Sequence, residues 1–361
     1  MDKSRQVVVI YLVTHFGLIF FLYPADIIAS VSVGHWSAVL FGFAIHFTLI
    51  GIYLKGLSYF ASQNVIDIFT GVSKVFAYIM LLPLALYFLS IMIIAIRAYA
   101  EIVSVIFLSE TPIWTIMLLF LIVSTLVSLS GIEPLMRTGV LVALLFSPFL
   151  ILVLILSFQN VDWRYALPVI DREVASFSYL LKRPFLQSLF AFVGGFLFLG
   201  FIPAQIPFKG RKIVWFSLVL LPFFLLSVYV PILTFGENTA SKFPFPFIMA
   251  VDTVDVSWLM FDRVTIFFMI SLLCFVILFL ALVMWTTLSL LKRGLPFIKV
   301  SVASVLLPIL VFIVCMLVPN WSAIEQLLWW NTYLRLYAAI VIPLTTLTLG
   351  IVRHRRGAVG Q

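Results

Sequence analysis

Side chains that could do chemistry inside the apolar runs of this sequence gather at two glycine-containing segments, one in the first run and one in the sixth. A glycine break in a membrane helix frees backbone groups that lipid cannot satisfy, so such a segment should face a protein-lined cavity. A half-helix that begins at a break could direct its partial positive charge toward an anionic ligand group. We therefore expect a small-molecule site between the two segments. Its predicted ligand-binding residues are Thr14, His15, Phe16, Gly17, Phe192, Gly194, Gly195 and Phe198.

Each of these features also has a purely structural interpretation. His15 could bind a ligand, or it could only hydrogen-bond a neighbouring helix. Glycines allow membrane helices to pack closely, and prolines such as Pro83 and Pro148 kink apolar runs that carry no predicted site. Matched breaks in the first helix of each half of the chain favour a functional break, and the packing interpretation stays open.

Two further residues whose side chains could do chemistry are Arg97 and Glu101, near the end of the third apolar run. Their spacing of four places both side chains on one face of a helix. Ionisable residues at a membrane helix end normally face protein or water rather than lipid. The pair is predicted to be either a structural ion pair or a gate.

Motifs of catalysis and metal binding do not occur in the sequence. It contains no nucleotide-binding P-loop, nucleophile elbow, HExxH zinc motif or CxxC pair. Cys274 and Cys315 lie inside apolar runs and are interpreted as packing residues. Asp252 and Asp255 could bind a cation weakly, but a solvated loop is the favoured interpretation. We predict neither a catalytic residue nor a metal or other cofactor, and no enzyme activity.

Composition places these residues in a membrane protein. Hydrophobic residues make up 64% of the 361 residues and charged residues only 10%, whereas soluble domains carry about 25% charge. A membrane-spanning helix needs about 20 apolar residues. The predicted spans are 7–25, 36–54, 75–96, 113–130, 138–157, 184–208, 213–235, 264–291, 300–318 and 336–352. The expected fold is all-α, with about ten transmembrane helices.

The distribution of charge predicts the orientation of these helices. With the N-terminus inside, most Lys and Arg residues fall in cytoplasmic loops or tails, among them Lys3, Lys209 and the tail Arg353–Arg356. This is the positive-inside pattern, so we expect both termini in the cytoplasm. The basic residues behind the net charge of +8 are then expected to contact lipid headgroups of the bilayer. Nucleic acid is not an expected partner.

The longest charged gap, residues 158–183, divides the predicted spans into two sets of five. An odd number of spans in each half inverts one half relative to the other. Five-plus-five inverted repeats are a transporter architecture in which broken helices form a binding site near the midplane. We expect one integral membrane domain, residues 1–361, containing a first repeat over 7–157 and a second over 184–352. Helices 1 and 6 are expected to be broken.

Several motifs, in order, resemble those of the endospore germination permease family, the B subunits of nutrient germinant receptors within the amino acid–polyamine–organocation superfamily. The resemblance covers nearly the whole chain. The matching segments are Arg97-Ala-Tyr-Ala-Glu101, Ser109-Glu-Thr-Pro-Ile-Trp114, Gly131-Ile-Glu133, Asn160-Val-Asp162, Leu167-Pro168, Phe190-x-Phe192-x-Gly194 through Pro203, and Val318-Pro-Asn320.

This resemblance implies a nutrient germinant, an amino acid or a sugar, bound between unwound helices 1 and 6. It also implies the spore inner membrane as location, a larger membrane A subunit and a lipoprotein C subunit as partners, and a role in triggering germination. The alternative is an autonomous secondary amino-acid transporter of the same superfamily. Few carboxylates lie within the predicted spans, which favours the receptor because proton-coupled transporters usually need them.

Overall fold

The computed structural model describes residues 2–60, 63–170, 175–255, 264–294 and 299–359, and every regular element in these ranges is a helix. The first half of the chain contains α1 (Lys3–Ile19), α2 (Tyr23–Ser30), α3 (His35–Ser58), α4 (Val65–Val72), α5 (Lys74–Ile106), α6 (Ile113–Leu129), α7 (Ile132–Leu156), and the short helices η1 (Ser157–Asn160), η2 (Trp163–Ala166) and η3 (Ser178–Leu181). The second half contains α9 (Arg183–Val193), η4 (Leu197–Phe201), α10 (Gly210–Ser217), α11 (Leu220–Phe235), α12 (Glu237–Ala240), α13 (Pro246–Asp252), α14 (Thr265–Gly294), α15 (Val300–Leu317), α16 (Trp321–Leu336), η5 (Tyr337–Val341) and α17 (Ile342–Val359).

Local sequence signals explain where several helices begin. Asn64 and Ser73 accept hydrogen bonds from the backbone at the first turns of α4 and α5, and Asn320 does the same for α16. Such caps satisfy amide groups that have no partner inside a helix. Pro24 and Pro184 stand in the first turns of α2 and α9, where the missing amide hydrogen of proline costs nothing.

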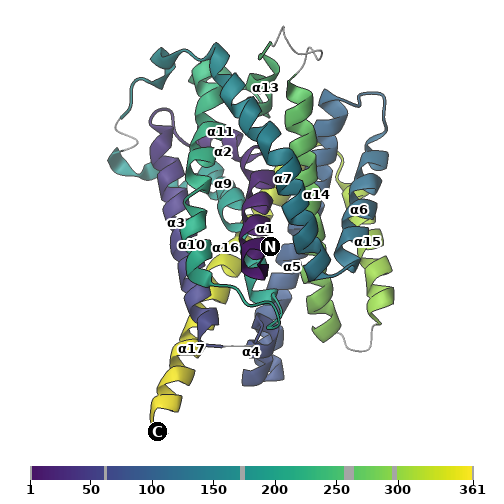
Figure 1. The fold of residues 1–361 in the computed structure, drawn as a ribbon. Helices are drawn as coiled ribbons and strands as arrows, with labels where there is room; N and C mark the ends of the chain where they lie inside the picture. Colours follow the sequence, from purple (N-terminus) through teal and green to yellow (C-terminus); the bar gives the residue numbers. More distant parts are fainter. Residues whose placement is uncertain (1, 61–62, 171–174, 256–263, 295–298, 360–361) are drawn as a thin grey trace.

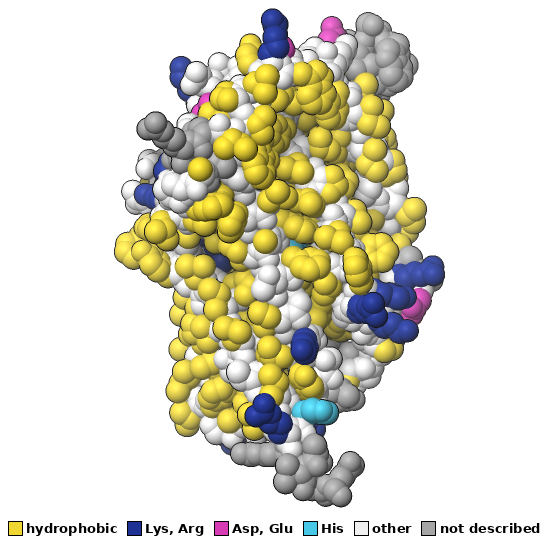
Figure 2. All heavy atoms as spheres, turned by 90° about the vertical axis from the view of Figure 1, so that its left-hand side faces the viewer, with side chains coloured by type: hydrophobic (Ala, Val, Ile, Leu, Met, Phe, Trp, Pro, Cys, Tyr) yellow, Lys and Arg dark blue, Asp and Glu magenta, His cyan; other side chains and the backbone are white. Residues whose placement is uncertain are grey.

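The all-α membrane fold predicted from composition is confirmed. Among the described residues, six helices are long and apolar enough to cross a membrane, and the bent pair α1–α2 raises this number to seven. Ile113–Leu129 and Ser301–Leu317 are shorter apolar helices. Hydrophobic side chains cover most of the middle of the face shown in Figure 2, as a lipid-facing surface requires. The count of ten spans and the inverted repeat stay predictions.

The helix that carries the first predicted site segment lies inside the bundle. Helix α1 contacts α14, α7 and α9, while α2 packs against α9, and α16 packs against α5 and α9. Figure 1 shows α13 at one end of the bundle, called here the loop end, and the C-terminus and α4 at the opposite end, called the termini end. Near the N-terminus, Lys3 pairs with Glu133 at 2.7 Å. The assignment of the termini end to the cytoplasm stays a prediction.

The last span differs from its predicted limits of 336–352. The structure has one candidate span over Trp321–Arg355, formed by α16, the π-helical turn η5 and α17. The charge of Arg335 ended the apolar run in the sequence. In the structure this side chain is completely buried by protein, so its charge does not meet lipid and the helix continues through it.

Candidate functional site

The break in the first helix falls between α1 and α2. Helix α1 ends at Ile19, α2 begins at Tyr23, and the two helices are bent by 59°. The chain therefore turns beyond Gly17 and directly before Pro24, whose ring cannot continue the hydrogen-bonding of the preceding helix. The carbonyl oxygen of Gly17 accepts a hydrogen bond from the hydroxyl of Tyr99 on α5.

Gly17 itself permits a close approach between helices. A Cβ atom at this position would lie 3.2 Å from the backbone carbon of Phe275 and the backbone nitrogen of Val276, both on α14. Glycine at such a contact lets two helix backbones pack together. The packing interpretation of Gly17 therefore fits this structure, and Pro24 is the residue that marks the break.

The break in the sixth span lies between α9, which ends at Val193, and η4, which begins at Leu197. Two carbonyl groups freed near it are bound by side chains of α3. The His46 Nδ1–H donates to the Phe192 carbonyl, and the Tyr53 hydroxyl donates to the Leu197 carbonyl at 3.2 Å. Protein groups thus satisfy part of the backbone that the break exposes, as an apolar environment demands.

Three rings pack against one another near the breaks: Tyr11 and His15 on α1, and His46 on α3. Since a carbonyl oxygen can only accept, the Nδ1 atom of each histidine carries the proton that it donates, His46 to Phe192 and His15 to Tyr11 at 2.7 Å. In the neutral imidazole, Nε2 is then an acceptor. The Tyr11 hydroxyl donates to His46 Nε2 at 2.6 Å. The Nε2 atom of His15 is buried and has no hydrogen-bond partner.

His15 lies directly against the break of the sixth span. A Cβ atom on Gly195 would stand 2.5 Å from His15 Cε1 and 2.8 Å from both ring nitrogens, so only glycine leaves room for the ring. Beside it, Gly194, Gly195 and Phe198 line a cavity of about 10 Å³ together with residues of α5 and α14. This volume holds about one water molecule. The described residues leave no room for a nutrient-sized molecule beside Gly195, and a ligand site at these residues stays a prediction.

The other predicted site residues are buried near these breaks. Thr14 donates to the Tyr11 carbonyl of its own helix at 2.9 Å. Phe16 packs against Phe223 and Phe275, with ring centroids 4.7 and 5.9 Å apart. The side chain of Phe192 stacks on Phe224 at 4.2 Å. These aromatic contacts make the walls around the breaks apolar, so a ligand there must find its polar partners among a few groups such as His15 Nε2.

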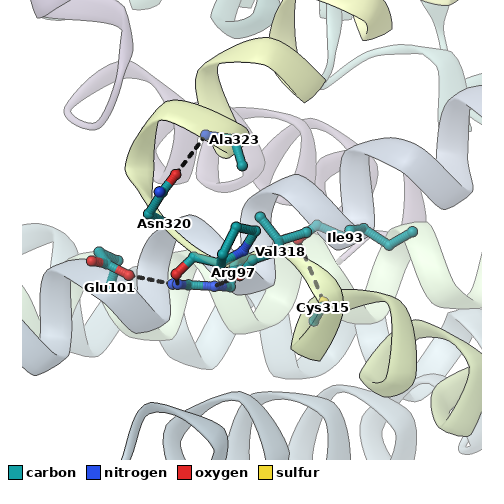
Figure 3. A network of polar contacts seen from close by, with 8 residues as sticks. Ile93, Arg97, Glu101, Cys315, Val318, Asn320 and Ala323 are labelled. Carbon is teal, nitrogen blue, oxygen red and sulfur yellow. Dashed lines mark hydrogen bonds and ion pairs between the residues drawn. The ribbon is translucent and has the colours of Figure 1, made fainter.

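Arg97 and Glu101 form an ion pair on α5. Figure 3 shows the guanidinium of Arg97 pointing from α5 to the turn between α15 and α16. There its Nε donates to the Val318 carbonyl at 3.0 Å and its Nη2 to the Pro319 carbonyl at 3.4 Å. These carbonyls lie in the turn that follows the last residue of α15, Leu317, so Arg97 links the α15–α16 turn to α5. The contacts fit the structural interpretation of the pair, and a gating role stays a prediction.

Two ionisable residues near the breaks were not among the predicted site residues. Arg335 on α16 is completely buried, and Asp26 on α2 interacts electrostatically with it. A charged residue inside a membrane bundle normally marks a functional position. In the sequence Asp26 followed the first apolar run and Arg335 preceded the last, so both looked like residues of helix ends. One sequence signal could have indicated that Arg335 is buried. The final apolar run is too short to span a membrane unless it extends through Arg335.

A larger pocket, of about 370 Å³, lies at the loop end. It is lined by residues 32–35, 165–168 and 236–239 and by one face of the end of α11, and includes His35 and Glu237. None of the predicted site residues lines it. Within the described ranges, three or more His, Cys, Asp or Glu side chains nowhere gather in a group that could hold a metal ion.

Comparison with known families gives one result. A family model described as spore germination protein matches residues 3–322 of the 361. The match covers well over half of the chain, and it confirms the family resemblance drawn from the motifs between residues 97 and 320. No curated protein is significantly similar to the chain.

Proposed function

Because the chain belongs to the spore germination protein family, we propose that it is the B subunit of a nutrient germinant receptor. In this proposal a small nutrient, an amino acid or a sugar, binds between the two broken helices. The chain lies in the spore inner membrane with both termini in the cytoplasm. It passes the signal to a membrane A subunit and a lipoprotein C subunit, since its loops are too short to hold a signalling domain.

The observation that carries this proposal is the contact between the two breaks. His15, one turn before the first break, fills the space beside Gly195 in the second, and its Nε2 acceptor is unpartnered. A ligand that offers a hydrogen-bond donor to Nε2 would have to move the ring and separate the two half-helices. Binding would then favour an open arrangement over the closed one, which is the differential affinity that a two-state switch needs.

A second candidate function is an autonomous secondary transporter that uses the same site for alternating access. Asp26 supports it, because the scarcity of carboxylates within the predicted spans was the reason to prefer a receptor. A carboxylate on α2 that interacts electrostatically with the buried Arg335 could couple transport to protons. Membership in the family and the fold agree with either function.

Germination of spores that lack the gene tests the proposal. The deletion strain should lose its response to one class of nutrient when amino acids, sugars and salts are compared, and the wild-type gene should restore it. The gene for the His15→Ala variant should restore the protein to the membrane of the deletion strain but should not restore the germination response. If purified protein alone in liposomes moved a nutrient at transporter-like turnover, the transporter would replace the receptor as the assigned function.

A further inference from the structure

The loop-end pocket, the cavity of about 370 Å³ at the loop end, takes no part in the proposed function. Its lining comes from three places in the chain: residues 32–35, residues 165–168, and the end of α11 with the residues that follow it. Small-molecule sites in proteins typically have volumes of about 300–1,000 Å³. The pocket therefore has the size to hold a small ligand of its own, apart from the two breaks.

Hydrogen bonds between distant segments join the walls of this pocket. Trp36 on α3 donates from its backbone nitrogen to the Tyr229 hydroxyl at 3.1 Å and from its indole nitrogen to the Val169 carbonyl at 3.0 Å. The backbone nitrogen of Asp162 donates to the Leu233 carbonyl on α11 at 2.9 Å. These bonds connect α3, α11 and the segment between α7 and α9, so the fold itself holds the three walls of the pocket in place.

His35, the first residue of α3, brings a hydrogen-bond acceptor to the lining. The backbone carbonyls of Ile28 and Val31 hydrogen-bond its imidazole ring. Because a carbonyl can only accept, the nitrogen bonded there carries the proton, and Nε2 of the neutral ring is an acceptor. Nε2 is buried and has no hydrogen-bond partner, whereas buried polar groups in proteins are nearly always bonded. A ligand that donates a hydrogen bond would complete this group.

The rest of the lining favours positive charge in a ligand. Glu237 contributes a carboxylate, and among the described residues no Lys or Arg lines the pocket. The rings of Tyr165, Tyr229 and Phe235 also line it, and the faces of such rings attract cations. A Cβ atom on Gly236 would lie 3.4 Å from Tyr165 Cε1, so this ring packs directly beside the backbone that carries Glu237. A cation therefore fits this lining better than an anion does.

We propose that the loop-end pocket binds a small organic ammonium ion, at a site separate from the nutrient site between the breaks. The N–H groups of this ligand would donate to His35 Nε2, its charge would lie near the Glu237 carboxylate, and its alkyl part would contact the aromatic rings. A zwitterionic amino acid fits less well, because no basic side chain of the described lining would pair with its carboxylate. A neutral alcohol of the same shape lacks the charge that the rings and Glu237 attract.

The test follows ligand binding with a thiol placed in the pocket. In a full-length chain with Cys274 and Cys315 replaced by serine, Asn238→Cys introduces this thiol in the lining, and its labelling by a neutral reagent is measured in detergent. Three ligands of similar shape are compared at pH 7 and constant ionic strength: butylamine, butanol, and norvaline, which is butylamine with an added carboxylate. Butylamine is charged at this pH, as a lysine side chain is. We expect it to slow labelling at concentrations about tenfold lower than either of the others requires.

Variants of the lining separate the effect of charge from that of shape. Glu237→Gln should reduce the preference for butylamine over butanol. Tyr165→Leu should weaken protection by butylamine, whereas Tyr165→Phe keeps the aromatic ring and should behave as the parent chain. The matched control is Trp163→Leu, because Trp163 belongs to the same short helix η2 as Tyr165, is 66% exposed and is not part of the lining. This control should leave protection by butylamine unchanged.

Thermal unfolding of the wild-type chain with the same three ligands gives their order of binding without any substitution, so the comparison holds even where a variant fails to fold. Equal effects of butylamine and butanol would make the pocket an apolar cavity and overturn the proposal. A stronger effect of norvaline than of butylamine would assign the pocket to amino acids and overturn it as well. Protection by none of the three ligands, or an unchanged preference in both Glu237→Gln and Tyr165→Leu, would also contradict it.

Discussion

Replacing Gly195 by alanine tests the contact that closes the proposed site. The added Cβ would stand 2.5 Å from His15 Cε1, a distance that forces the ring or the backbone to move. Inserting a methyl group into a packed core costs about 1–3 kcal/mol. We therefore expect Gly195→Ala to unfold at a lower temperature in detergent and to accumulate less in membranes.

The matched control is Gly51→Ala on α3, where an added Cβ meets no atom within 4 Å. Alanine is favoured over glycine inside a helix by about 0.5–1 kcal/mol, so this variant should be as stable as wild type or more so. The two glycine variants thus differ in the predicted sign of the effect, and one assay measures both.

Removing the imidazole ring of His15 tests whether this ring causes the loss of stability in Gly195→Ala. His15→Ala combined with Gly195→Ala should recover part of the stability that Gly195→Ala loses, because contacting residues show coupling of about 0.5–3 kcal/mol in double-mutant cycles. Strictly additive effects, or a Gly195→Ala protein that unfolds at the same temperature as Gly51→Ala, would refute the interpretation that His15 fills the gap beside Gly195.

Three further results are expected. Tyr99→Phe removes the hydroxyl that bonds the Gly17 carbonyl, so it should lower stability by about 0.5–1.5 kcal/mol, measured by thermal unfolding. Arg97→Gln should reduce protein abundance on immunoblots without shifting the nutrient concentration for half-maximal germination, whereas a shift would indicate a gate. A reporter active only outside the cytoplasm should work at Lys242 and fail after Arg356, and the opposite pattern would overturn the predicted topology.

The sequence was sufficient for the fold class and for the existence of a break in the first helix and another in the sixth span. Long apolar runs can only be helices in lipid, and Pro24 and the Gly194-Gly195 pair interrupt two of them. Apolar runs and the residues that interrupt them are local in the sequence, so they can be recognised without knowing which segments lie next to them in the fold. The division into two inverted repeats depends on spatial symmetry and stays a prediction.

Contacts between distant segments could not be predicted in the same way. Gly17 looked like a break but allows α1 to approach α14, a fact that depends on residues near 275. His15 fills the space at Gly195, which is 180 positions away in the chain. Arg335 set the start of the last predicted span because hydropathy treats every charge as facing lipid, whereas this charge is buried and bonded to α9.

Protection of an introduced cysteine tests most directly whether the nutrient binds at the breaks. In a chain with Cys274 and Cys315 replaced by serine, Phe198→Cys places a thiol at the cavity beside Gly195, and Asn238→Cys places one at the loop-end pocket. Labelling by a small thiol reagent is measured in membranes with and without the nutrient that triggers germination. We expect the nutrient to change labelling at position 198 and to leave position 238 unchanged. Protection at 238 with no change at 198 would place the ligand in the loop-end pocket and contradict a site between the broken helices.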